Sequence, residues 1–78
     1  MKDSPVALLL KELIHFDKSS ATSVYIQISQ QIINAIQRGY LKEGMALPGT
    51  RIFSQLLNIH RNTAVAVYDE LDSQGWVE

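Results

Sequence analysis

The chain has 78 residues, of which 46% are hydrophobic and 19% charged, with 7 Lys and Arg against 8 Asp and Glu, and no cysteine. This length supports one small domain, and the lack of cysteine excludes disulfide bonds, thiolate zinc sites and cysteine nucleophiles. No apolar run approaches the roughly 20 residues that cross a bilayer, so no membrane contact is expected and a cytoplasmic location fits the composition.

The first predicted element is an amphipathic helix over residues 5–14. Ser4 and Pro5 have the residue types of an N-cap and a first helical position, and apolar residues at helical spacing follow: Val6, Leu9, Leu10, Leu13 and Ile14. Residues 13–17 also alternate partly, which leaves a short strand open there. Residues 1–22 are expected to be this helix and a polar linker, appended to a domain over residues 23–78. So apolar a helix is expected to pack on its own domain or on a second copy.

Three further helices are predicted. The first covers residues 23–38 and stops at Gly39, the second covers residues 50–57 and stops at Asn58, and the third covers residues 61–73 and stops at Gly75. Residues 41–47 are expected to form a turn and a short extended piece, and residues 76–78 to begin a strand. The predicted inward-facing residues are Tyr25, Ile28, Ile32, Ile36, Phe53, Leu56, Leu57, Ala64, Val67, Tyr68 and Leu71. The layout is typical of a mainly α, winged helix-turn-helix fold with a three-helix core and an additional N-terminal helix.

Charge is distributed unevenly along the chain. Residues 44–68 contain no acidic residue but include Arg51, His60 and Arg61. Such a weakly basic face suits a polyanion, although solvated surface charge gives the same pattern. The two histidines, His15 and His60, have no spacing typical of a nucleophile or a metal site, and the glycines form no phosphate loop. No enzymatic activity, cofactor or metal is therefore expected in this chain.

The candidate DNA-binding residues cluster at the start of the helix over residues 61–73. Arg61 can donate two hydrogen bonds to guanine, Asn62 can pair with adenine, and the free N–H groups near Thr63 attract a phosphate. Val65 and Ala66 are small enough to meet thymine methyl groups. The alternative is that Asn62 and Thr63 only cap the helix.

Three other side chains have two interpretations each. Arg51 can clamp the phosphate backbone or form a salt bridge with Asp69 or Glu70. Tyr68 and Trp76 can stack on bases, but their register with the apolar positions favours packing on the core.

Several spaced motifs agree with one known family: Tyr25-Ile26-Gln27-Ile28, Leu47-Pro48-Gly49-Thr50-Arg51, Arg61-Asn62-Thr63 and Gly75-Trp76-Val77. Together they resemble the DNA-binding domain of the GntR family of bacterial transcriptional regulators, over about residues 24–78. The resemblance implies that the helix over residues 61–73 enters the major groove of a double-stranded DNA operator. It implies Arg51, Arg61 and Thr63 as contact residues, with His60 and Asn62 at neighbouring contact positions.

The resemblance also implies a homodimer that reads two half-sites in the cytoplasm, associated with the nucleoid. Residues 16–18, the Ser/Thr linker and residues 61–63 resemble the family's MocR subgroup most, in which the winged helix is fused to an aminotransferase-like domain that binds pyridoxal phosphate. A two-domain relative with a helical C-terminal dimerisation domain remains open. The family's wing is incomplete at residue 78, so weaker DNA binding is expected. His60 stands where the family has a capping Ser or Thr, and imidazole accepts a hydrogen bond only when neutral, so binding is expected to depend on pH.

A second function remains open. The near-zero net charge and the incomplete wing suit a small helical protein–protein interaction or dimerisation module without DNA binding. In that case the apolar stretch over residues 6–14 would dock a partner or a second copy.

Overall fold

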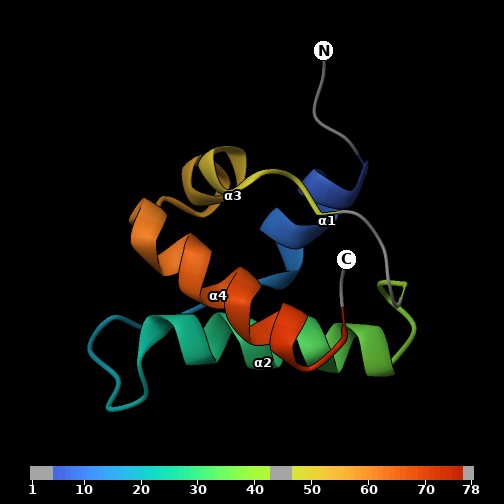
Figure 1. Cartoon of the computed structure of the whole chain (residues 1–78), viewed down its shortest axis with the longest axis horizontal. Coiled ribbons are helices and arrows are strands. Elements are labelled where there is room, and N and C mark those ends of the chain that lie inside the picture. The colour runs from blue at the N-terminus through green and yellow to red at the C-terminus, as the bar shows by residue number, and fades with distance from the viewer. Residues whose placement is uncertain (1–4, 43–46, 77–78) are drawn as a thin grey trace.

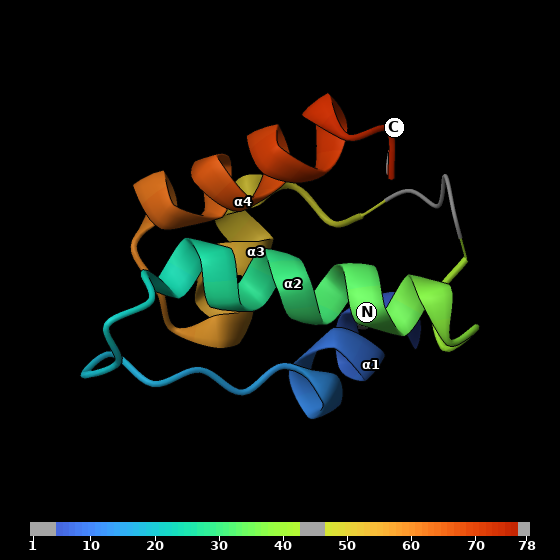
Figure 2. The same cartoon turned by 90° about the horizontal axis from the view of Figure 1, so that it is seen from below.

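The computed structural model describes residues 5–42 and 47–76 and forms four helices within them. They are α1 (Pro5–Leu13), α2 (Val24–Gln37), α3 (Thr50–Leu57) and α4 (Arg61–Ser73). Both α2 and α3 pack against α4 on one side and α1 on the other. Figure 2 shows α2 lying between α4 and α1, with α3 behind it, while Figure 1 shows α4 crossing α2. The predicted helical core is confirmed.

The helix ends follow local backbone chemistry. The predicted bounds of α3 and α4 are confirmed. The first helix ends one residue before its predicted end at residue 14, and α2 is one residue shorter at each end because Ser23 and Arg38 are its cap residues. Asn58, Gly39 and Gly75 have φ angles of 55°, 84° and 77°, in the left-handed region that stops a helix. All three predicted stop positions are therefore confirmed.

The core draws on all four helices. The fully or nearly fully buried side chains include Leu10, Ile14, Ile28, Ile32, Ile33, Ile36, Phe53, Leu57, Ala64, Val67 and Leu71. Three predicted core residues, Tyr25, Leu56 and Tyr68, are only partly buried and pack at its edge. Because Leu10 is 0% exposed, the prediction that the N-terminal helix packs on its own domain is confirmed.

The strand left open over residues 13–17 is wrong, since no strand forms within residues 5–42 and 47–76. Two side chains of α2 hold this segment's backbone instead. The Gln27 amide accepts from the Asp17 N–H at 2.9 Å and donates to the Asp17 carbonyl at 2.9 Å, and the Gln31 amide bonds the N–H and carbonyl of His15 in the same way. Gln27 and Gln31 are four residues apart on a helix and therefore about 6 Å apart along its axis, close to the about 6.6 Å between alternate residues of an extended chain such as His15 and Asp17. The two glutamines can therefore bond both residues at once. Figure 2 shows the segment running beside α2.

Parts of three predictions fall outside the described residues. They concern Ser4 as the expected N-cap of the first helix, Gly44 and Met45 in the expected turn, and residues 77–78 in the expected strand. Of the neighbouring residues, Leu41 is buried, Leu47 packs against the core, and Trp76 is half-buried against it. Within the described part of the chain, no helix is long and apolar enough to cross a membrane.

Candidate nucleic-acid interface

The turn between α3 and α4 is short and tightly bonded. Asn58 donates its N–H to the carbonyls of Ser54 and Gln55, and Ile59 donates its N–H to the Ser54 carbonyl at 2.9 Å. Ile59 also packs against the core. With three residues in this turn, α3 and α4 form a helix-turn-helix unit whose second helix starts in a defined position.

His60 is the N-cap of α4. Its Nδ1 accepts a hydrogen bond from the Asn62 backbone N–H at 3.0 Å, and its carbonyl accepts from the N–H groups of Thr63 and Ala64. The alternative in which Asn62 or Thr63 caps the helix is wrong. An Nδ1 that accepts a hydrogen bond carries no proton, so this cap requires an imidazole ring with an unprotonated Nδ1. The Asn62 side chain is left exposed for other partners.

The predicted contact residues of α4 divide into two groups. Arg61 and Asn62 are exposed at its start, whereas Thr63 and Ala66 are half-buried and face the beginning of α2. A hollow of about 250 Å³ lies between the two helices, lined by Ser23, Val24, Tyr25, Asn62, Thr63 and Ala66. Sequence reasoning missed the α2 residues of this hollow, because nothing in their local pattern indicates which helix they meet.

Arg51 is exposed in the first turn of α3. Among the residues that the structure describes it forms no salt bridge, so the alternative pairing with Asp69 or Glu70 is wrong. Glu70 instead accepts a hydrogen bond from the Gln74 amide at 2.5 Å. The Arg51 guanidinium therefore remains available to a phosphate.

Tyr68 packs on the core and does not form an exposed stacking platform. Its ring lies 5.0 Å from that of Phe53 at an interplanar angle of 53°, and its hydroxyl donates to the Pro48 carbonyl. Burial raises the pKa of this hydroxyl. Trp76 also packs against the core, so the favoured core interpretation is confirmed for both aromatic residues.

The comparison with curated proteins finds transcriptional regulators. The repressor YtrA of Bacillus subtilis (strain 168) is 33% identical over 66 residues, which cover 85% of this chain and 51% of YtrA. The pyridoxine biosynthesis regulator PdxR of Corynebacterium glutamicum is 31% identical over 77 residues, 99% of this chain and 15% of PdxR. The regulator GgaR of Escherichia coli (strain K12) is 36% identical over 56 residues, 72% of this chain and 23% of GgaR.

This chain is a GntR-type helix-turn-helix DNA-binding domain, and its homologues are GntR-family transcriptional regulators. It spans about half the length of YtrA and smaller shares of PdxR and GgaR. No family model and no solved structure matches it. The four described helices form a helix-turn-helix DNA-binding domain of this family. The relatives are named as regulators and not as enzymes.

The charge of α4 in this GntR-family domain changes sign along the helix. Arg61 lies at its start, while Asp69, Glu70 and Asp72 lie in its last turns. Between them Val65 is 41% exposed, on the same side of the helix as Arg61 four residues earlier. Only the first two turns of α4 therefore lack negative charge that would repel a DNA backbone.

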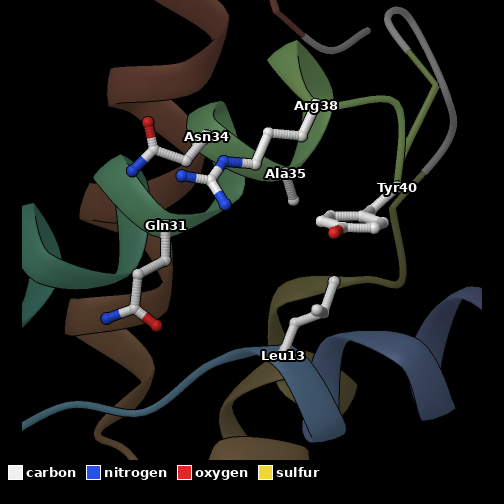
Figure 3. A pocket seen from close by; sticks show the side chains of 6 residues that line it. All are labelled: Leu13, Gln31, Asn34, Ala35, Arg38 and Tyr40. Carbon is white, nitrogen blue, oxygen red and sulfur yellow. The ribbon is translucent and has the colours of Figure 1, made fainter.

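The GntR-family domain has another hollow at the opposite end of α2. It measures about 280 Å³ and is lined by Leu13, Gln31, Asn34, Ala35, Arg38 and Tyr40. Figure 3 shows the Tyr40 ring and Leu13 on one side of the opening and the polar side chains of α2 on the other. The predicted DNA-contact residues are not among its lining. Exposed side chains at this hollow, such as Arg38 and Tyr40, are therefore suitable positions for control variants.

Proposed function

We propose that this domain binds a double-stranded DNA operator with the first two turns of α4 in the major groove. The observation that carries the proposal is the pair of exposed side chains, Arg61 and Asn62, at the capped start of the second helix of a helix-turn-helix unit. Arg61 is proposed to donate to guanine and Asn62 to pair with adenine. The acidic last turns, which include Asp69 and Asp72, then stay outside the groove.

The remaining predicted site residues are proposed to position the helix. Arg51 is free to bind the phosphate backbone from α3, and His60 holds the first turn of α4 in shape by capping it. Thr63 and Ala66 line the hollow beside the start of α2, where a sugar–phosphate strand can pass close to both helices.

We further propose that the protein acts as a homodimer in the cytoplasm, because one short helix offers few base contacts and two half-sites multiply them. Residues 1–22 are proposed to be a supporting helix and linker for the domain over residues 23–78.

Pyridoxal phosphate does not fit this chain's own residues. An enzyme or regulator that holds this cofactor as a Schiff base needs a sheltered lysine. Lys11, Lys18 and Lys42, the lysines of the described part of the chain, are all exposed and line neither hollow. A cofactor site of the MocR kind is therefore proposed only for a further domain.

The test is selection of duplexes from a random pool, followed by fluorescence anisotropy titration of a selected duplex at two salt concentrations. Arg61→Ala should weaken binding by about 5- to 150-fold, the range expected for one base-reading arginine, and relax selection at one base pair.

Arg38→Ala is the matched control, because Arg38 is an exposed arginine that lies about 20 Å along α2 from the hollow beside α4. Equal losses in the two variants, or a selected duplex that binds Arg61→Ala as tightly as the wild type, would contradict the proposal.

A further inference from the structure

Tyr68 joins α4 to the segment that leads into α3. It lies in the middle of α4, and its hydroxyl donates to the carbonyl of Pro48, 20 residues earlier in the chain. The side chain is half-buried, so the bond is partly sheltered from water. A hydrogen bond between a side chain and a loop carbonyl fixes the position of that loop relative to the helix that donates it.

The same loop is fastened to α3 from the other side. Gly49, next to Pro48, is the N-cap of α3, and its carbonyl accepts the Phe53 N–H at 2.9 Å. The Phe53 ring in turn lies 5.0 Å from the Tyr68 ring. Tyr68, Pro48, Gly49 and Phe53 therefore form a closed ring of contacts around the first turn of α3. We call these four residues the α3 brace.

Arg51 is carried by the turn that the α3 brace encloses. Its side chain is exposed and, within the described residues, free of ion pairs, so the position of this turn's backbone determines which phosphate its guanidinium can reach. Arg61 is attached to α4 instead. A protein that places one arginine on the backbone and another in the groove needs the two helices in fixed register.

We propose that Tyr68 is a positioning residue for DNA binding: its hydroxyl holds the first turn of α3 so that Arg51 meets a phosphate while α4 lies in the groove. The inference rests on the proposed function. It assigns to the hydroxyl a role that the packing of the ring does not supply. Tyr68→Phe keeps the ring and its contact with Phe53 and removes only the bond to Pro48.

The experiment is a double-mutant cycle measured by anisotropy on a duplex selected by the wild type. Tyr68→Phe is expected to weaken binding by about 2- to 12-fold, the range for one hydrogen bond. It should also reduce the magnitude of the slope of log affinity against log salt concentration by about 1, the value for one lost phosphate contact, as Arg51→Ala should. In the Arg51→Ala background, Tyr68→Phe should change neither quantity. In the Arg61→Ala background it should weaken binding by the same factor as in the wild type.

Tyr40→Phe is the matched control, because Tyr40 is 60% exposed and lines the hollow at the far end of α2. A loss of stability alone would weaken binding equally in the Arg51→Ala and Arg61→Ala backgrounds, and that outcome overturns the inference. Unchanged affinity in Tyr68→Phe alongside a clear Arg51→Ala effect overturns it as well. In either case the wild type still binds and Arg61→Ala still binds about 5- to 150-fold more weakly, so the proposed function stands separately.

Discussion

Replacing Leu10 by Ala should show that α1 is part of the folded core. Leu10 is 0% exposed and belongs to the same buried cluster as Ile32 and Phe53, on α2 and α3. Leu8, two residues earlier on the same helix, is 52% exposed. The same chemical change at these two positions therefore removes either a core contact or a surface side chain.

The expected loss follows from the carbons removed. Leu→Ala deletes three carbons, worth about 0.8 kcal/mol each when buried, and the cavity left behind brings the cost to about 3 kcal/mol. A domain of this size has a free energy of unfolding of roughly 4–12 kcal/mol. Since 1 kcal/mol corresponds to about 4–8 °C in a small domain, Leu10→Ala should lower Tm by about 12–24 °C. Leu8→Ala should change the free energy of unfolding by less than about 0.5 kcal/mol.

The assay is urea and thermal unfolding followed by far-UV circular dichroism, with the wild type and both variants at one protein concentration. A single transition that moves by the expected amount in Leu10→Ala means that α1 unfolds together with the rest of the domain. Equal midpoints for Leu10→Ala and Leu8→Ala would refute the reasoning, because α1 would then behave as an appended arm.

Two further predictions concern polar contacts. In urea unfolding, His60→Ala should lower the free energy of unfolding by about 1 kcal/mol, because the Asn62 N–H loses its acceptor. His60→Asn should keep most of that stability, and His15→Ala should change it little. Equal effects of His60→Ala and His15→Ala would contradict the role of His60 as the cap. Hydrogen bonds from the Ser19 hydroxyl and N–H lower the pKa of Asp17 below its ordinary value of 3.8, so the stability that they contribute is present above that pH and lost as the pH falls through the lowered value. In an NMR titration, Ser19→Ala removes the hydroxyl bond and keeps the backbone one, so it should raise the Asp17 pKa toward 3.8. An unchanged pKa would show that the hydroxyl bond is not a cause of the shift.

The site divides in the same way as the fold between what the local sequence indicates and what it does not. The position of Arg61 and Asn62 at the start of a helix could be predicted from the sequence, because a helix start after a short turn is a local feature. The unusual cap at His60 could be predicted for the same reason. The contribution of Tyr25 to the hollow beside α4 could not, since its register indicates only a core-facing position.

The sequence by itself determined the four helices and, to within one residue, where they end. Stops such as Gly39 and Asn58 act through the backbone angles of single residues and through hydrogen bonds within one turn, so the pattern of neighbours is enough to find them. It also indicated the family, because several spaced motifs together resembled one family, and the homologues found at about 30% identity are GntR-family regulators.

Only the tertiary structure decided which segments these helices hold together. Gln31 bonds His15 across 16 residues, and Tyr68 bonds Pro48 across 20. A glutamine or tyrosine at such a position has the same local pattern whether its polar group meets water or a distant backbone. The choice depends on how α1, α3 and α4 pack around α2, since packing alone brings those groups within hydrogen-bonding distance.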